Sequence, residues 1–171
     1  ETGSDRIAEA VEGLDCDIVV NIQGDEPFTR KEVIEQVLRP FYMEDGDSID
    51  LCTLKEQMDS HEDISNPNNV KVITDISGSA LYFSRSPIPY PRDPRSGARW
   101  WRHIGIYAFR RQALEMFSHW PMGELEASEK IECLRFLEHG RRIKVVETSG
   151  MRVSIDTPED LAKAERILKG G

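Results

Sequence analysis

Apolar and polar residues alternate in blocks along the chain, and these blocks predict strands and helices in turn. The clearest strand covers 17–23, where a run rich in β-branched residues ends at Gly24; this is typical of a buried central strand in a parallel sheet. Similar runs predict strands at 49–54, 70–74, 80–84, 102–110 and 142–147. Apolar residues at helical spacing predict helices at 4–13, 111–120, 124–139 and from 157 onward.

Local signals predict where several of these elements begin and end. Thr29-Arg30-Lys31-Glu32 predicts a capping box that starts another helix, and this helix has an apolar stripe at Ile34, Val37, Leu38 and Phe41. Gly140 follows the helix at 124–139 at the position where a left-handed residue commonly ends a helix. Asp75-Ile76-Ser77-Gly78 predicts a hairpin turn, and the prolines from Pro87 to Pro94 exclude regular structure as far as Gly97. The order of elements predicts a three-layer α/β domain with a partly mixed sheet.

Two acidic residues stand at the predicted ends of strands. Asp25 is the first acidic side chain after the strand at 17–23, and Asp156 stands between an apolar segment at 151–155 and the start of the last helix. Ligands of open α/β sheets bind beyond the carboxyl ends of the strands, and carboxylates suit Mg²⁺. A polar turn is the structural alternative for Asp25. Helix capping explains Thr157 and Pro158 but gives Asp156 no structural duty.

Composition and charge narrow the class of protein. The chain has 171 residues, of which 39% are hydrophobic, and its formal net charge is -9. An acidic surface does not favour a nucleic-acid partner. We also expect no membrane span, because no apolar run approaches the length of about 20 residues that a span needs, and no signal peptide precedes the first helix. Cys16, Cys52 and Cys133 lack metal-ligand spacing, so a reducing, cytoplasmic location is expected.

Seven segments resemble one known family and occur in the family's order. The chain resembles the 3-deoxy-manno-octulosonate cytidylyltransferase (CMP-Kdo synthetase) family through TGSDRIAE (2–9), NIQGDEP (21–27), NPNNVKV (66–72), ALYFSRSPIPY (80–90), HIGIYAFR (103–110), EKIECLR (129–135) and DTPEDL (156–161). The resemblance implies one domain over 1–171, a three-layer α/β/α Rossmann-like nucleotidyltransferase with a mixed, mostly parallel sheet and a hairpin insertion. It also implies transfer of CMP from CTP to 3-deoxy-D-manno-octulosonate (Kdo), giving CMP-Kdo and pyrophosphate for lipopolysaccharide biosynthesis.

The resemblance also assigns roles to individual residues. Asp25 and Asp156 would be catalytic and hold Mg²⁺, while Gly3, Ser4 and Arg6 would seat the cytidine. The sugar acid would be bound by Gln23, Arg85, His103 and Glu132, with the Arg85 guanidinium available for its carboxylate. A hydrogen-bonded structural histidine and a surface glutamate are the alternatives for His103 and Glu132. The resemblance further implies a homodimer, whose interface would include the proline-rich stretch and the neighbouring Trp100 and Trp101.

The chain departs from the family's pattern at two places. Cys133 stands where the family commonly has a glutamine that hydrogen-bonds sugar hydroxyls, so the sugar acid could be a variant such as 8-amino-Kdo or a nonulosonate. The family's first strand and glycine-rich triphosphate loop have no counterpart, so the chain resembles a truncated form that we expect to be inactive by itself. A non-catalytic nucleotide-sugar-binding domain of the same fold is the other alternative.

Overall fold

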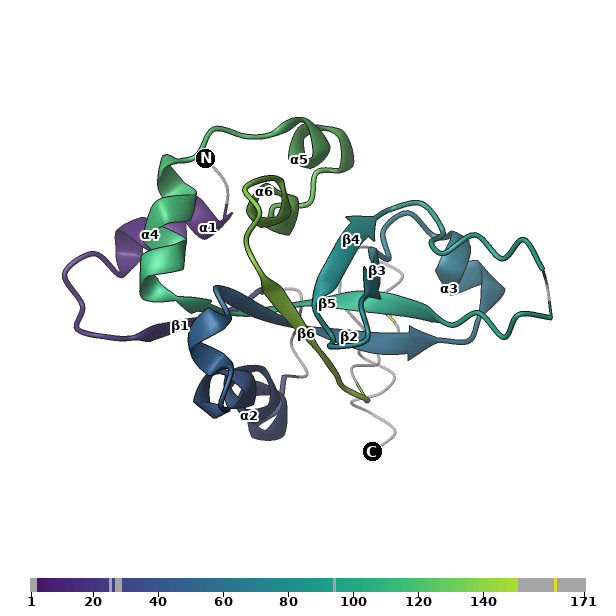
Figure 1. The fold of residues 1–171 in the computed structure, drawn as a ribbon, viewed down its shortest axis with the longest axis horizontal. Coiled ribbons are helices and arrows are strands. Elements are labelled where there is room, and N and C mark those ends of the chain that lie inside the picture. Colours follow the sequence, from purple (N-terminus) through teal and green to yellow (C-terminus); the bar gives the residue numbers. More distant parts are fainter. Residues whose placement is uncertain (1–2, 25, 27–28, 94, 151–161, 163–171) are drawn as a thin grey trace.

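The longest strand, β5 (Trp100–Arg110), runs through the middle of a six-stranded sheet (Figure 1). The computed structural model describes residues 3–24, 26, 29–93, 95–150 and 162. The strand order is β4-β3-β5-β2-β6, with β1 also paired to β5. The other strands are β1 (Ile18–Ile22), β2 (Leu51–Met58), β3 (Lys71–Thr74), β4 (Ala80–Ser84) and β6 (Ile143–Glu147).

Helices cover both faces of the sheet, as the three-layer prediction requires (Figure 1). One face carries α1 (Gly3–Ala10), α4 (Arg111–His119), α5 (Glu124–Glu129) and α6 (Cys133–Glu138), and the other carries α2 (Lys31–Leu38) with its 3₁₀ extension Arg39–Tyr42. The short elements Gly46–Ser48 and α3 (His61–Ser65) precede and follow β2. Within the described ranges, every helix is too short or too polar to cross a bilayer.

Side chains of β5 alternate between two hydrophobic clusters, one on each face of the sheet. Ile104, Ile106 and Ala108 pack with Val33 and Val37 of α2, because successive side chains of a strand point to opposite faces. Phe109 and Tyr107 belong to the opposite cluster, which also contains Phe117, Phe136, Leu114 and Leu134 from α4 and α6. The odd-numbered residues His103, Gly105 and Tyr107 therefore share the face that carries α1 and α6.

Strand direction differs from the prediction for 17–23. β1 pairs antiparallel with β5, and β2, β3 and β4 also form antiparallel pairs; β2 with β6 is the parallel pair among the described strands. The prediction of a mostly parallel sheet is therefore wrong for this part of the chain, although the sheet is mixed. β1 is also less buried than predicted, since Val19 alone of its residues is buried. An apolar run indicates burial and strand formation but carries no information on the direction of the partner.

The predicted helix at 124–139 is two helices. α5 ends at Glu129, Lys130 takes a left-handed conformation at φ 55° and ψ 47°, and α6 begins at Cys133. Arg85 donates hydrogen bonds to the carbonyl oxygens of Glu129 and Lys130, which a continuous helix would use for the N–H groups four residues later. Tertiary hydrogen bonds thus interrupt a helix that the apolar spacing alone favours.

Smaller differences concern boundaries and caps. α2 has Arg30 at its N-cap without a side-chain cap, and the Thr29 hydroxyl donates to the Glu26 carbonyl instead of forming a capping box. The buried stripe of α2 is Val33 and Val37, continued by Phe41, while Ile34 and Leu38 are half-buried. The hairpin of β3 and β4 has the predicted turn, in which the Asp75 carboxylate accepts from the backbone of Ser77 and Ser79.

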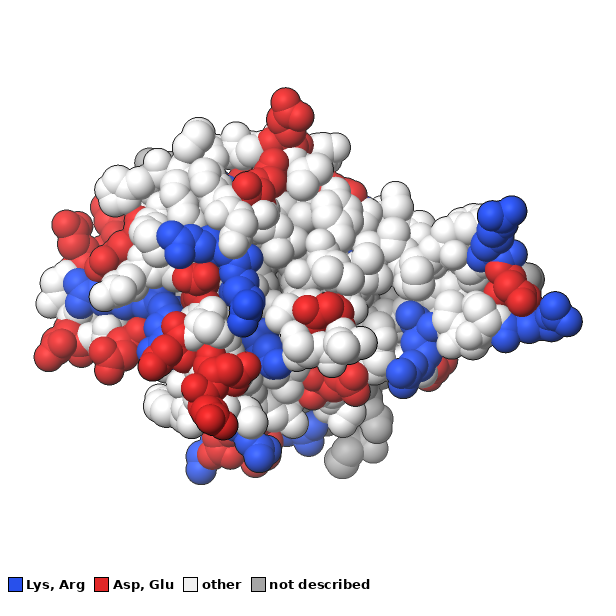
Figure 2. Space-filling model, in the orientation of Figure 1, with Lys and Arg blue, Asp and Glu red and all other residues white. Residues whose placement is uncertain are grey.

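Acidic and basic side chains are interspersed over the face seen in Figure 2. The projecting segment between β4 and β5, at one end of the molecule in Figure 1, carries basic side chains at its tip. Its sequence includes Arg92, Arg95 and Arg99. The predicted last helix, including Thr157 and Pro158, lies outside the described residues except for Ala162, which is helical.

Candidate functional site

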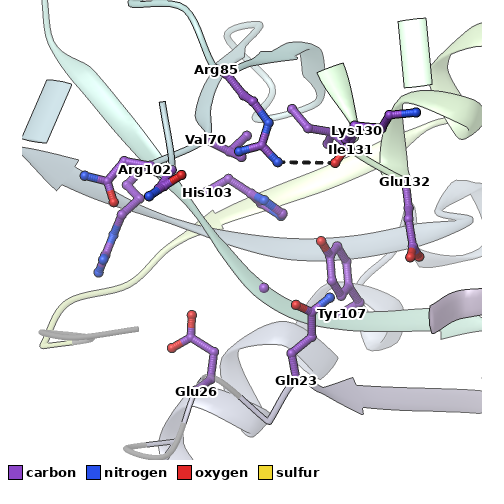
Figure 3. Close-up of a pocket in the computed structure, with 13 residues that line it drawn as sticks. Gln23, Glu26, Val70, Arg85, Arg102, His103, Tyr107, Lys130, Ile131 and Glu132 are labelled. Carbon is purple, nitrogen blue, oxygen red and sulfur yellow. Dashed lines mark hydrogen bonds between the residues drawn. The ribbon is translucent and has the colours of Figure 1, made fainter. Parts of the chain in front are cut away.

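A cavity of about 530 Å³ opens on the face of the sheet that carries α1 and α6. Its walls come from the end of β1, the loop before β3, the end of β4, β5 and the turn between α5 and α6 (Figure 3). The lining residues are Gln23, Glu26, Asn68, Asn69, Val70, Arg85, Arg102, His103, Gly105, Tyr107, Lys130, Ile131 and Glu132. The cavity is predominantly polar and contains side chains of both charges.

The structure brings together the residues predicted to bind the sugar acid. Gln23, Arg85, His103 and Glu132 line this one cavity although they lie on four separate elements. In Figure 3, Arg85 and Gln23 approach from opposite sides, with His103 between them. Arg6, predicted to seat the cytidine, is exposed on α1 and is not among the described residues that line the cavity. The binding roles of all these residues stay predictions.

Glu132 joins this cavity to the start of α1. Its carboxylate accepts hydrogen bonds from the Gly3 N–H at 2.9 Å, the Ser4 N–H at 3.1 Å and the Ser4 hydroxyl at 2.6 Å. The first N–H groups of a helix have no partner within the helix, and a carboxylate there is also favoured by the helix dipole. Glu132 is therefore a tertiary cap of α1 and not a plain surface glutamate, which was the alternative; its contact with the sugar acid stays a prediction.

Arg85 fixes two walls of the cavity relative to each other. Its Nε donates to the Glu129 carbonyl oxygen at 2.7 Å and its Nη1 to the Pro67 carbonyl oxygen at 2.9 Å, and Nη2 lies 3.4 Å from the Lys130 carbonyl oxygen. A guanidinium has five N–H donors, so these contacts leave two N–H groups without a partner in the described part of the chain. Arg85 is thus less available than predicted, but it retains donors for an anion.

Lys71 holds the same loop from beneath. Its side chain is fully buried, and its ammonium donates to the carbonyl oxygens of Asn66 at 3.0 Å and Asn69 at 2.6 Å. Burial, followed by the nearby Arg85 guanidinium, lowers the pKa of Lys71, while Glu129 opposes the shift. Because their carbonyl oxygens are bound to cations beneath the loop, residues 66–69 are fixed as one wall of the cavity.

His103 is a neutral side chain in this setting. Burial lowers its pKa to about 3, so the ring supplies no positive charge near neutral pH. Its Nε2 lies 2.9 Å from the Thr53 hydroxyl oxygen, and the ring packs edge-on against Phe83 with 5.0 Å between centroids. His103 is therefore both a hydrogen-bonded structural histidine, as the alternative held, and a lining residue of the cavity.

The remaining charges of the cavity are distributed among several elements. Arg102 pairs with Glu56 of the neighbouring strand at 3.0 Å, and Glu26 is buried with its carboxylate at the cavity wall (Figure 3). Asp25 and Asp156, the predicted metal ligands, lie outside the described residues. Within the described ranges, no group of three or more histidine, cysteine, aspartate or glutamate side chains could hold a metal ion.

Comparison with known proteins decides the family. The Cytidylyltransferase family model matches residues 1–143. A 3-deoxy-manno-octulosonate cytidylyltransferase of Christiangramia forsetii is 58% identical over 168 residues, covering 98% of this chain and 68% of that protein. The enzyme of the same name from Flavobacterium johnsoniae is 57% identical over 169 residues, covering 99% of this chain and 69% of that protein.

The chain belongs to the 3-deoxy-manno-octulosonate cytidylyltransferase family. A solved structure of CMP:2-keto-3-deoxy-manno-octonic acid synthetase complexed with CTP has a TM-score of 0.90 and 37% sequence identity, covering 99% of this chain and 69% of that one. A 4-diphosphocytidyl-2C-methyl-D-erythritol synthase from Anaerococcus prevotii, at 16% identity and a TM-score of 0.59, shares the fold alone. The Rossmann-like nucleotidyltransferase fold is confirmed.

Cys133, which stands where the family commonly has a glutamine, points away from the cavity. It is buried in the hydrophobic cluster beneath α6 and is not among the described residues that line the cavity. Burial raises the pKa of its thiol well above the ordinary range, so the group is an inert part of the core. Cys133 itself therefore does not contact a ligand in this cavity, and the expectation that the sugar acid is a variant stays a prediction.

Several lining residues were missing from the sequence-based site. Asn68, Asn69 and Lys130 belong to motifs that carried the resemblance, but no role was assigned to them. Polar side chains beside a buried strand start could have indicated the two asparagines. The left-handed turn that presents Lys130 depends on contacts from Arg85, which no local signal records.

Proposed function

We propose that this protein transfers CMP from CTP to 3-deoxy-D-manno-octulosonate, releasing pyrophosphate, in the biosynthesis of lipopolysaccharide. The observation that carries the proposal is the convergence of Gln23, Arg85, His103 and Glu132 on one polar cavity in a member of this family. An acid sugar with many hydroxyl groups fits a cavity that offers amide groups, a neutral imidazole and guanidinium N–H groups.

The reaction proceeds by displacement at the α-phosphorus of CTP. The anomeric hydroxyl oxygen of the sugar forms a bond to this phosphorus, the bond to the bridging oxygen breaks, and pyrophosphate leaves while the hydroxyl proton is released. Such transfers depend on positioning and on neutralisation of charge. In this proposal the two remaining Arg85 N–H groups bind the carboxylate of the sugar acid, and Gln23 and His103 bind its hydroxyl groups.

The nucleotide would lie next to the sugar cavity. Gly3 and Ser4, predicted to seat the cytidine with Arg6, are bonded to Glu132 at the cavity wall. Through this contact the start of α1 and the sugar cavity form one continuous structure. Arg6, exposed on α1, would reach the nucleotide from the outer side of the helix.

We further propose that Asp25 and Asp156 hold Mg²⁺. Carboxylates are the donors that this ion prefers, and bound Mg²⁺ would neutralise charge on the triphosphate. In the sequence Asp25 stands between Gly24 and Glu26, and Glu26 lines the cavity. Asp25→Asn and Asp156→Asn should each lose activity at limiting Mg²⁺. Unchanged activity would contradict this metal-binding role.

A cytoplasmic homodimer remains part of the proposal. Tyr90 in the proline-rich segment and Leu81 on β4 are large and exposed, which suits an interface. Trp101 contributes less, because it packs within the chain against Lys55 and Arg99. Sedimentation of the protein and of Tyr90→Ser would test the dimer.

The experiment that tests the function measures pyrophosphate release from CTP by the full-length protein with a panel of sugar acids. We expect release with 3-deoxy-D-manno-octulosonate and formation of its CMP conjugate. Release with 8-amino-Kdo or a nonulosonate instead would indicate a related cytidylyltransferase. Binding of CTP without release for any acid would indicate a non-catalytic domain. The inactivity of the 171-residue chain by itself stays a prediction, measured in the same assay.

A further inference from the structure

Thr53 lies at an irregularity in the sheet directly behind the cavity. The pairing of β2 with β5 shifts between Thr53, which faces Tyr107, and Leu54, which faces Ile104. Two residues of β5, Gly105 and Ile106, are therefore extra at this point, which is the pattern of a β-bulge. Gly105 lies against the Gln23 side chain here, since a Cβ added at Gly105 would be only 3.2 Å from the Gln23 amide oxygen.

The Thr53 hydroxyl has three polar neighbours at this bulge. Its oxygen lies 3.1 Å from the Ile104 carbonyl oxygen, 2.9 Å from the Ile106 carbonyl oxygen and 2.9 Å from Nε2 of His103. Thr53 itself is 0% exposed, so no solvent replaces these contacts. It does not line the cavity and acts only through its neighbours.

The single proton of the Thr53 hydroxyl determines which nitrogen of the His103 ring is protonated. A hydroxyl has one proton to donate, and carbonyl oxygens only accept. The proton of Thr53 therefore points at the carbonyl oxygens of the bulge, and the ring nitrogen is the partner that must supply a proton to the hydroxyl oxygen. A neutral imidazole carries one N–H, so a proton on Nε2 leaves a lone pair on Nδ1.

We propose that Thr53 is a positioning residue that holds His103 as the Nε2–H tautomer, so that Nδ1 accepts a hydrogen bond from a hydroxyl group of the sugar acid. This proposal rests on the proposed function for the identity of the ligand. His103 lines the cavity, and its Nδ1 has no hydrogen-bond partner among the residues that the structure describes. Phe83 and Tyr107, with ring centroids 5.0 Å and 5.4 Å away, restrict rotation of the ring.

Charge separates this role from the alternative of a cationic histidine. Burial keeps the ring neutral, so His103 does not pair with the substrate carboxylate, and an accepting nitrogen selects a hydroxyl donor instead. Arg85, which also lines the cavity, supplies a positive charge for the carboxylate. The two side chains thereby distinguish the hydroxyl from the carboxylate of the same molecule.

The tautomer can be measured directly in the full-length protein labelled with ¹⁵N-histidine. Long-range ¹H–¹⁵N correlation spectra distinguish the two neutral tautomers, and loss of one set of signals in His103→Gln assigns the ring. We expect Nε2–H in the wild type and in Thr53→Ser, which keeps the hydroxyl. Thr53→Val should lose this single tautomer. An Nδ1–H wild-type ring, or a Thr53→Val spectrum with an unchanged Nε2–H ring, would overturn the proposal.

Steady-state kinetics provide a second test of the positioning role of Thr53. Thr53→Val should raise KM for the sugar acid roughly tenfold, the effect of a lost hydrogen bond with an unsatisfied partner, with KM for CTP unchanged, and Thr53→Ser should restore the wild-type value. In a His103→Phe background, Thr53→Val should add nothing. Thr74→Val is the control, since its hydroxyl contacts Lys55 and not His103.

An additive effect of Thr53→Val in the His103→Phe background, or equal rises in both KM values, would overturn the positioning role. Should Thr53→Val not fold, the wild-type tautomer and the Thr53→Ser kinetics still decide. A protein that binds CTP but transfers CMP to no sugar acid would overturn the proposed function instead. The NMR spectra of the His103 ring would still test the positioning role of Thr53, because they do not depend on activity.

Discussion

Arg135 of α6 and Arg85, which follows β4 and contacts the break between α5 and α6, show how differently a guanidinium can be held. Arg135 of α6 is 3% exposed and forms two parallel bonds to Glu126 of α5, at 2.6 Å and 2.7 Å. Its Nη1 faces the carbonyl oxygens of Phe117 and Trp120 and lies 3.6 Å from an Asp5 carboxylate oxygen. Arg85, in contrast, contacts neutral carbonyl oxygens, and its charge is not cancelled by a directly bonded carboxylate.

The difference distinguishes a structural arginine from one that is available for a ligand. Bidentate pairing with a carboxylate satisfies both the charge and the geometry of Arg135, so this buried guanidinium has its positive charge neutralised inside the protein. At the cavity the Glu129 carboxylate accepts from the Ser84 hydroxyl and the Arg85 N–H of the backbone, not from the guanidinium. The Arg85 side chain therefore keeps positive charge and two donors for an anion.

The largest effect is expected from breaking the structural pair. Arg135→Met leaves Glu126 buried without its partner, which should lower the free energy of unfolding by about 3–5 kcal/mol. Urea denaturation measures the loss. The control is Lys31→Met, because Lys31 pairs with Glu35 at the exposed surface of α2 and its loss should cost less than about 1 kcal/mol. Similar losses in the two variants would contradict the contrast.

The second prediction concerns pH and the cavity side of the comparison. His103 has its pKa lowered from 6.5 to about 3, so between these values the unfolded chain takes up a proton that the folded protein does not. The free energy of unfolding should therefore fall as pH decreases through this window, by up to about 1.4 kcal/mol per pH unit from this residue.

Urea denaturation at several pH values measures this slope against His103→Gln as the reference. The variant lacks the titrating ring, so its free energy of unfolding should fall less steeply below pH 6.5 than that of the wild type. The value 6.5 is the ordinary pKa of histidine, from which the pKa of His103 is lowered. The acidic residues titrate in both proteins and cancel in the difference. Identical slopes would mean that the ring is not held neutral.

Arg85→Lys should separate the two substrates. Lysine retains the charge but loses the planar fork, so KM for the sugar acid should rise roughly tenfold, which equals about 1.4 kcal/mol, while KM for CTP changes little. Steady-state kinetics with each substrate varied in turn give both values. Equal rises would show that Arg85, like Arg135, serves structure alone.

The smallest effect is expected from the lysine beneath the cavity loop. Lys71→Met removes the contacts to the Asn66 and Asn69 carbonyl oxygens and should raise KM for the sugar acid a few-fold, because the loop that carries Asn68 becomes less well fixed. Lys55→Met is the control: Lys55 is also buried, but it contacts Thr74 and Glu147 away from this loop. A rise of the same size in the control would contradict the role of Lys71.

Local sequence signals predicted much of the fold. The bounds of β4 and the turn at Asp75 followed from turn residues between two apolar runs, and Gly140 has the expected positive φ of 67°. The direction of β1 did not follow, because a buried run has the same composition in either orientation. The break at Lys130 did not follow either, since it depends on bonds from Arg85, 45 positions away.

The candidate site was predicted in its members more than in their roles. Motifs placed Gln23, Arg85, His103 and Glu132 in one site, and the structure gathers them. The cap that Glu132 forms on Ser4 joins residues 128 positions apart. The contact between Thr53 and His103 forms at a bulge in the sheet. Such contacts exist only once the strands have paired, so spacing along the chain carries no trace of them.

The most direct test of the central claim compares two substrates in wild type and Arg85→Lys. The specificity constant kcat/KM is measured for 3-deoxy-D-manno-octulosonate and for its analogue with the carboxylate reduced to an alcohol. If the free Arg85 donors bind the carboxylate, the wild type should prefer the natural acid strongly, and Arg85→Lys should lose most of that preference while still turning over CTP. A variant that retained the full preference would contradict the account.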